Sequence, residues 1–157
     1  MISKWDERFL ALAQHIAGWS KDPSTKVGAV ITDARHRVVS LGFNGFPRGI
    51  EDSEMRLQDR ETRVKMVVHA EENALLHARV PVDGCSIYVW PLPPCSSCMA
   101  KLIQAGVVRV VAPEPSEPHM ANWSLGITKT LAREAGVELE LVARSRAPEG
   151  PESRDVP

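Results

Sequence analysis

The sequence has few cysteines, no long apolar run and no excess of charge of either sign. Its three cysteines are an odd number, and Cys95 and Cys98 stand close together, so a disulfide framework is not expected. No stretch approaches the roughly 18 consecutive apolar residues of a membrane helix. The first ten residues mix acidic and basic side chains, which predicts no signal peptide. We therefore expect a reduced, cytoplasmic protein that has no membrane partner.

Charge and composition narrow the class of partner. The chain carries 19 basic and 20 acidic side chains, for a formal net charge of -1. A nucleic-acid-binding protein usually shows a basic excess, so a small molecule is the expected partner and nucleic acid is not. We predict one domain over residues 1–143 of the 157, because this length suits a single core. Residues 144–157 are rich in Pro, Glu, Ser and Arg and are predicted to be a disordered tail.

Apolar spacing and turn residues predict helices that alternate with strands. A helix over 3–19 should begin at Ser3 as its N-cap and place Trp5 and Trp19 on its core face. Residues 50–66 are weakly patterned and predict an irregular excursion with one helical turn. Strands are predicted at 27–31, 38–43, 85–89, 107–112 and 137–142, and further helices at 69–79, 96–104 and 121–135. This order predicts an α/β fold of three layers, α/β/α, around a five-stranded mixed sheet.

Three side chains have the chemistry of metal ligands: His69, Cys95 and Cys98. The two cysteines stand three residues apart at the start of a predicted helix, so both sulfurs can face one point. The N-terminus of a helix favours the thiolate form. One imidazole and two thiolates suit zinc, and three protein ligands leave a position for water, as in catalytic zinc sites. Cys85, at the start of a strand, is expected to be a buried thiol instead of a fourth ligand.

Glu71 follows His69 by two residues, which places a carboxylate beside the metal without making it a ligand. There it can take a proton from zinc-bound water and pass it to the substrate as general base and acid. Alone, the Cys-x-x-Cys pair could equally be a structural zinc clip or a redox pair. Because both motifs open helices and follow strand-like segments, together they predict a catalytic zinc site.

The two motifs, His69-Ala70-Glu71 and Pro94-Cys95-Ser96-Ser97-Cys98, fit the H-x-E…P-C-x-x-C signature of zinc nucleobase deaminases. Over residues 5–142 the chain resembles the cytidine deaminase superfamily, and most closely its deoxycytidylate (dCMP) deaminase branch. The segments that carry the resemblance are 21–30, 42–49, 68–74, 87–89 and 94–107.

This resemblance implies zinc-dependent hydrolysis of dCMP to dUMP, which supplies thymidylate synthesis. It implies that Asn44, in the loop after the second strand, contacts the sugar of the nucleotide, although an Asn-Gly pair also suits a plain turn. It further implies activation by dCTP with Mg²⁺, inhibition by dTTP, and a homo-oligomer, either a hexamer or a dimer. With no cysteine before Cys85, a second zinc site found in some members of the branch is not expected.

The sequence indicates less clearly which residues bind the base and the 5′-phosphate of the nucleotide. Ala70, between the two motif residues, is predicted to contact the substrate, and Trp90, beside a proline-rich run, to stack on the base. We favour Lys26 and Arg48 as phosphate ligands because they flank motif segments. A single basic side chain is more often a solvated surface charge. The basic residues before the catalytic helix that could reach a 5′-phosphate are Lys26, Arg48, Arg56, Arg60, Arg63 and Lys65.

Other functions fit parts of the pattern. The substrate could be deoxycytidine, dCTP or a modified dCMP, whereas a tRNA adenosine deaminase would need a basic face. A non-catalytic nucleotide-binding regulator would have no use for Glu71, which this chain keeps. A structural zinc module would unfold on chelation, whereas a catalytic zinc site would lose activity and keep its fold.

Overall fold

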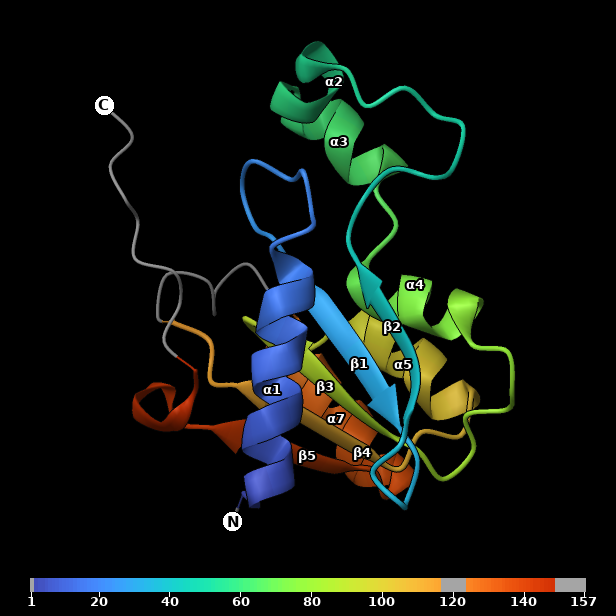
Figure 1. Cartoon of the computed structure of the whole chain (residues 1–157), viewed down its shortest axis with the longest axis vertical. Helices are drawn as coiled ribbons and strands as arrows, with labels where there is room; N and C mark the ends of the chain where they lie inside the picture. Colours follow the sequence, from blue (N-terminus) through green and yellow to red (C-terminus); the bar gives the residue numbers. More distant parts are fainter. Residues whose placement is uncertain (1, 117–123, 149–157) are drawn as a thin grey trace.

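The computed structural model describes residues 2–116 and 124–148 and shows one five-stranded sheet with helices on both faces (Figure 1). The elements are α1 (Lys4–Ala17), β1 (Gly28–Thr32), β2 (Val38–Phe43), α2 (Glu54–Gln58), α3 (Arg60–Met66), α4 (Ala70–His77), β3 (Ser86–Trp90), α5 (Ser96–Gln104), β4 (Arg109–Pro113), α7 (Leu125–Ala135), β5 (Glu138–Val142) and the 3₁₀ helix η1 (Arg144–Arg146). The strand order is β2-β1-β3-β4-β5. Strand β1 is antiparallel to β2 and β3, and β3, β4 and β5 are parallel. The predicted mixed sheet is therefore confirmed.

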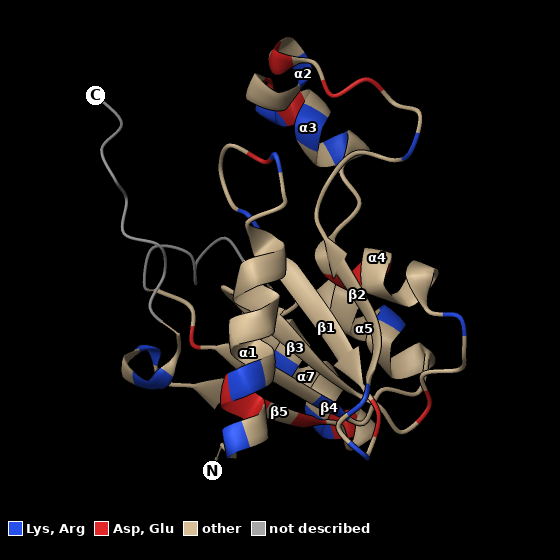
Figure 2. Cartoon of the chain, viewed as in Figure 1, with Lys and Arg blue, Asp and Glu red and all other residues tan. Residues whose placement is uncertain are grey.

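Between β2 and α4 the chain leaves the sheet and forms α2 and α3, which project past the end of the sheet and carry many charged side chains (Figure 2). The expectation of one helical turn in residues 50–66 is wrong. Helix α2 buries no residue and α3 buries only Arg63, so apolar periodicity gives almost no signal there.

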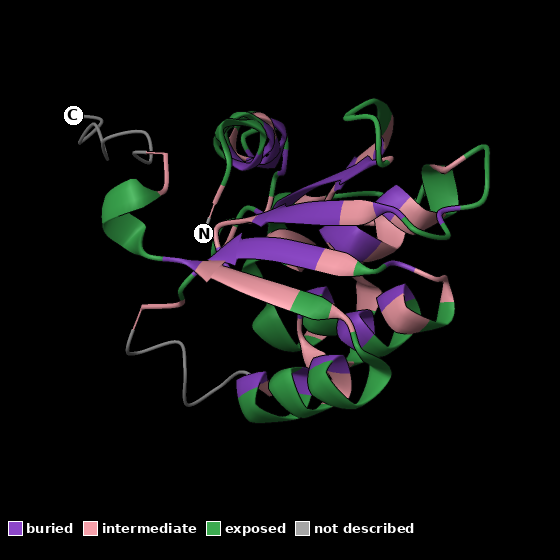
Figure 3. Cartoon of the chain, turned by 90° about the horizontal axis from the view of Figure 1, so that it is seen from below, coloured by how far each residue is buried: buried purple, intermediate pink, exposed green. Residues whose placement is uncertain are grey.

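Side chains of the sheet alternate between two cores, one on each face, because successive residues of a strand point to opposite sides. Figure 3 shows the sheet between α1 and the other helices. Val30, Tyr88 and Val111 face α1. The opposite core, against α4, α5 and α7, receives Ala29, Ile31, Ile87, Val89, Val110 and Ala112. This is the predicted three-layer arrangement.

Helix α1 begins as predicted, because Ser3 and Asp6 form a reciprocal capping box. The two tryptophans predicted on its core face do not lie in the core: Trp5 is 40% exposed, and Trp19, which follows the end of the helix at Ala17, is 52% exposed. A 14-residue helix is about 21 Å long, whereas a five-residue strand spans about 16 Å. The ends of α1 therefore overhang the sheet. Trp5 stacks on His36 of the β1–β2 turn instead.

Helix α4 packs unusually close to β2. A Cβ atom on Gly42 would lie 2.5 Å from the carbonyl oxygen of Ala70 and 2.5 Å from the amide nitrogen of Ala74. The hydroxyl of Ser40 also donates to the carbonyl of Ala74 at 2.7 Å. These contacts fix the start of α4, where the predicted catalytic residues lie.

The C-terminal region is described in part. Helix η1 occupies the beginning of the predicted tail, and residues 149–157 lie outside the described residues, as do residues 121–123 of the predicted helix over 121–135. Within the described ranges, no helix has the length and apolar character that crossing a membrane requires.

Candidate active site

The predicted metal ligands come together at the starts of two helices. His69 immediately precedes α4, Cys95 immediately precedes α5, and Cys98 lies in the first turn of α5. Nδ1 of His69 is 3.7 Å from Sγ of Cys95 and 3.3 Å from Sγ of Cys98. The three ligand atoms all lie within 4.8 Å of one another, and no other group of this kind occurs in the described part of the chain.

This triangle has the size that zinc requires. Tetrahedral zinc, with bonds of about 2.3 Å to sulfur and 2.0 Å to nitrogen, holds its ligand atoms roughly 3.5–3.8 Å apart. Of the two separations from His69, 3.7 Å lies within that range and 3.3 Å lies about 0.2 Å below it. The donor set of one imidazole and two thiols is also one that zinc prefers. The three side chains therefore fit a zinc ion as they stand.

The two thiols differ in acidity. A hydrogen bond from Cys98 lowers the pKa of Cys95 to about 4, helped by His69 and opposed by burial. The same hydrogen bond, together with burial, raises the pKa of Cys98. The interaction with Cys95 raises the pKa of His69, against the effect of burial. Because a metal ion binds cysteines as thiolates, a cation held by both sulfurs would release their protons.

Glu71 lies in the first turn of α4 and is only 3% exposed. Burial raises the pKa of its carboxyl group to about 7. Its carboxylate is not one of the three clustered ligand atoms, yet it lines the same cavity as His69. A buried carboxyl group beside a candidate metal site and open to a cavity is placed for proton transfer.

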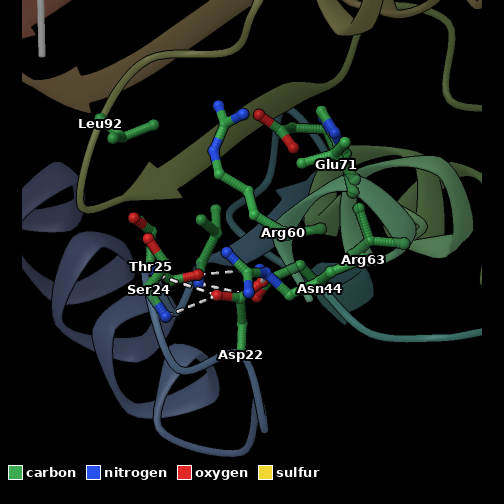
Figure 4. A pocket seen from close by; sticks show the side chains of 13 residues that line it. Asp22, Ser24, Thr25, Asn44, Arg60, Arg63, Glu71 and Leu92 are labelled. Atoms are coloured by element: carbon green, nitrogen blue, oxygen red, sulfur yellow. Dashed lines mark hydrogen bonds and ion pairs between the residues drawn. The ribbon is translucent and has the colours of Figure 1, made fainter. Parts of the chain in front are cut away.

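The cavity has a volume of about 180 Å³ and lies where β3 ends and β1 begins, with Gly28 opposite Trp90 in the sheet (Figure 4). Ligand sites of open α/β sheets commonly occupy this edge. The lining side chains come from the α1–β1 loop, the β2–α2 loop, α3 and the residues after it, the start of α4 and the β3–α5 loop: Asp22, Ser24, Thr25, Val27, Asn44, Arg60, Arg63, Val64, Val67, His69, Ala70, Glu71 and Leu92.

Asn44 lines this cavity and joins the loops around it. Its Oδ1 accepts a hydrogen bond from the amide of Val27 at 2.9 Å, and its Nδ2 donates to the carbonyl of Thr25 at 2.9 Å. The hydroxyl of Ser20 donates to the Asn44 carbonyl at 2.9 Å. Asn44 is therefore more than a turn residue, since its side chain holds the α1–β1 loop at the cavity.

The other predicted substrate contacts divide into two groups. Ala70 is buried in the wall of the cavity. Lys26, Arg48 and Trp90 do not line it. Nζ of Lys26 turns back to the carbonyl of Ser20, Arg48 lies on an exposed turn, and Trp90 packs against the core under α1.

Among the described basic residues that the sequence offers for phosphate binding, Arg60 and Arg63 are the two at the cavity. Both line the cavity from α3. Their spacing of three residues puts them on one side of a helix. That signal was present in the sequence, but it has meaning only once residues 60–66 are known to be helical.

Comparisons with known proteins agree with this geometry. The model of the cytidine and deoxycytidylate deaminase zinc-binding region matches residues 3–114. The "uncharacterized deaminase in luxG 3′ region" of Aliivibrio fischeri is 45% identical over 141 residues, which cover 88% of this chain and 94% of that protein. The deoxycytidylate deaminase of Homo sapiens is 39% identical over 114 residues, which cover 69% of this chain and 64% of the human protein. This chain therefore matches slightly less than two thirds of the human enzyme's length.

The fold also occurs in solved structures. The dCMP deaminase from the cyanophage S-TIM5, in complex with dCMP and dUMP, superimposes with a TM-score of 0.71 and 24% identity, over 90% of this chain and 99% of that one. The apo form of that protein has a TM-score of 0.70 and 23% identity. At this level of identity the likeness concerns the fold.

Proposed function

The chain belongs to the cytidine and deoxycytidylate deaminase family, and from that membership we propose that it is a zinc-dependent enzyme that hydrolyses dCMP to dUMP and ammonia. The observation that carries the proposal is the position of Glu71. It is buried in the cavity wall and follows His69 by two residues, and His69 forms a cluster of zinc-binding size with Cys95 and Cys98. Relatives named deoxycytidylate deaminase support dCMP as the substrate.

Each part of the site has a role in the reaction. Hydrolytic deamination adds water at C4 of the cytosine ring, protonates N3 and releases the 4-amino group. Zinc held by His69, Cys95 and Cys98 would supply hydroxide at neutral pH by lowering the pKa of a water molecule. The carboxylate of Glu71 would take one proton from the attacking water and give it to N3, and would then carry the proton of the new C4 hydroxyl group to the departing amine as the C4–N bond breaks.

The remaining wall orients the nucleotide. Asn44 and Ala70 lie on the same cavity as Glu71, from separate segments, and Leu92 closes it from the β3–α5 loop. Asn44 can offer one further amide hydrogen, beyond the one given to Thr25, to a sugar hydroxyl. Such contacts hold C4 against the hydroxide and keep other water out.

The test is to incubate zinc-loaded protein separately with dCMP, deoxycytidine, dCTP and CMP and to follow loss of the 4-amino group by absorbance. We expect dCMP to be turned over fastest. Turnover of another cytosine compound in preference to dCMP would establish that compound as the substrate. Binding of dCMP without turnover of any of the four would favour a non-catalytic regulator.

Chelation separates a catalytic from a structural zinc. We expect a chelator to abolish turnover while the circular dichroism spectrum is largely retained, and added zinc to restore the rate. Unfolding on chelation would instead identify a structural site.

Regulation and assembly follow the family resemblance. We propose activation by dCTP with Mg²⁺, inhibition by dTTP, and a homo-oligomer, hexamer or dimer. Adding each nucleotide to the dCMP assay and measuring the molar mass by light scattering tests these predictions. All three cysteines are free, and thiols that must bind zinc suit a reducing compartment such as the cytoplasm.

A further inference from the structure

We propose that Arg60 binds the 5′-phosphate of the substrate and so makes the chain selective for a cytosine nucleotide over the free nucleoside. The inference rests on the proposed function, because it concerns the same cavity. It assigns phosphate recognition to α3, outside the helices that carry the metal cluster and Glu71.

Among the described residues that line the cavity, Arg60 and Arg63 are the two arginines, and both belong to α3. Arg63 has a structural role, since its side chain is buried (8% exposed) and bonded to neighbouring segments. Its Nη1 donates to the carbonyl of Leu57 at 2.5 Å, and its Nε lies 3.5 Å from the carboxylate of Asp22. Arg63 therefore ties α3 to the α1–β1 loop and leaves ligand binding to its neighbour.

Arg60 differs from Arg63 in both exposure and bonding. It is exposed, and it forms no hydrogen bond or ion pair with any residue of the described ranges. In Figure 4 its side chain extends into the cavity, with the guanidinium group on the side of Glu71. An arginine held at a cavity by a fixed helix, yet without a partner, is available to an incoming anion.

Three other cations of the segments around the cavity already have partners among the described residues. Arg56 donates to the carbonyl of Glu51 at 2.9 Å. Lys21 pairs with Asp52 at 2.6 Å, and Lys65 pairs with Glu61 at 2.9 Å. None of these three cations lines the cavity. Among the described residues, Arg60 is thus the uncommitted cation of the site.

The α1–β1 loop supplies further donors for a phosphate. Ser24 and Thr25 line the cavity, and their hydroxyl groups have no hydrogen-bond partner among the described residues. Their backbone amides donate to Asp22 at 2.8 Å and 3.0 Å. Those two bonds and Arg63 balance the charge of Asp22, which would otherwise repel a phosphate. Among the described basic side chains that line the cavity, the one without an anionic partner is therefore Arg60.

The experiment compares kcat and KM for dCMP and for deoxycytidine in the zinc-loaded wild-type protein and in Arg60→Gln. We expect kcat/KM for dCMP to fall roughly 10- to 100-fold, mainly through KM, because one charge-assisted interaction with phosphate is lost. The value for deoxycytidine should stay within about twofold, because that substrate has no phosphate for Arg60 to bind. Arg133→Gln, which removes an exposed arginine of α7 outside the cavity, is the matched control and should match the wild type on both substrates.

Three results would overturn the assignment: an unchanged KM for dCMP, an equal loss on both substrates, or a wild-type protein that prefers deoxycytidine. A failure of the proposed function is distinguished by binding. If the wild type turns over neither compound, its thermal stabilisation by dUMP and by deoxyuridine is compared. A larger shift with dUMP that disappears in Arg60→Gln would uphold the phosphate site alone, and equal shifts would reject it.

Discussion

Each ligand of the proposed zinc site is set by a short local pattern. His69 and Cys95 directly precede helices, and Cys98 follows one turn later, so their geometry depends on two helix starts. Cys85 has the same chemistry, but it is buried in the core among apolar side chains. Cys85 can therefore serve as the control when the effect of replacing a cysteine of the cluster is measured.

We predict that Cys98→Ser will reduce bound zinc from about one ion per chain to nearly none, with affinity lowered at least about 100-fold, because a catalytic site with three protein ligands has none to spare. Cys85→Ala should keep its zinc and lose only about 1 kcal/mol of stability from the small cavity that it creates. Metal analysis of the purified proteins checks both. Full zinc occupancy in Cys98→Ser would exclude this ligand set.

The sequence was sufficient to predict that Cys95 and Cys98 lie together with His69 and Glu71, because each pair is close along the chain and opens a helix. It was insufficient for the phosphate side of the cavity. Arg60 reaches the site only through the fold of residues 54–66, which bury almost nothing and so leave no apolar pattern. Trp90 failed as a pocket residue because its side chain falls on the α1 side of the sheet.

At the scale of elements, the site depends on how closely α4 lies against β2. Gly42 permits that approach, since a Cβ atom there would sit 2.5 Å from backbone atoms of α4. Asn73 of α4 also donates to the carbonyl of Phe43 at 2.7 Å. Just before α4, Gly45 and Val68 exchange backbone hydrogen bonds of 3.1 Å and 2.8 Å. These ties hold His69 and Glu71 in register with Asn44.

We predict that Gly42→Ala will push α4 away from β2, lower the free energy of unfolding by about 1–3 kcal/mol through overpacking, and weaken zinc binding roughly 10-fold by shifting a ligand. Gly126→Ala is the matched control, because Gly126 is exposed in α7 and a Cβ atom there meets nothing within 4 Å. It should be neutral or stabilising by up to about 1 kcal/mol. Urea unfolding and competition titration with a zinc indicator measure both effects. Gly42→Ala with unchanged zinc affinity would show that the close approach does not position the ligand.

The five strands were predictable because apolar runs bounded by Gly, Pro and Asp mark them clearly. Helix α5 was also predictable, and Gly106, at φ of 90°, follows its end as expected. Sequence pattern does not reveal how far a helix extends past the sheet that it covers. For that reason Trp5 and Trp19 were placed in the core, although both are exposed.

At the scale of the whole molecule, a buried polar network joins α1 to β3 and β4, away from the cavity. Asp6 of α1, 2% exposed, accepts hydrogen bonds from Arg109 of β4 at 2.6 Å and 3.2 Å and from Tyr88 of β3 at 3.0 Å. Burial alone would raise the pKa of Asp6, but bonds from Arg109, the Ser3 amide and Tyr88 outweigh it and lower the pKa to about 2. The network therefore requires the ionised carboxylate.

We predict that this network makes the protein sensitive to acid. Because the folded pKa of Asp6 lies below its unfolded value, its contribution is complete above about pH 5 and is lost as pH falls toward 2. Asp6→Asn should cost roughly 2–4 kcal/mol at pH 7 and should flatten the decline of stability between pH 5 and 2. Urea unfolding at several pH values measures both, and parallel curves for the two proteins would rule out this role for Asp6.

The assignment of proton transfer to Glu71 is tested by comparing wild type and Glu71→Gln, both zinc-loaded, for zinc content and for the rate of conversion of dCMP to dUMP. Glutamine keeps the size of the side chain but cannot carry the proton, and Glu134→Gln, exposed on α7, is the control. We expect one zinc per chain in all three proteins, and a kcat about 1,000-fold lower in Glu71→Gln alone. Undiminished turnover in Glu71→Gln, or a zinc-loaded wild type that leaves dCMP unchanged, would contradict the proposed mechanism.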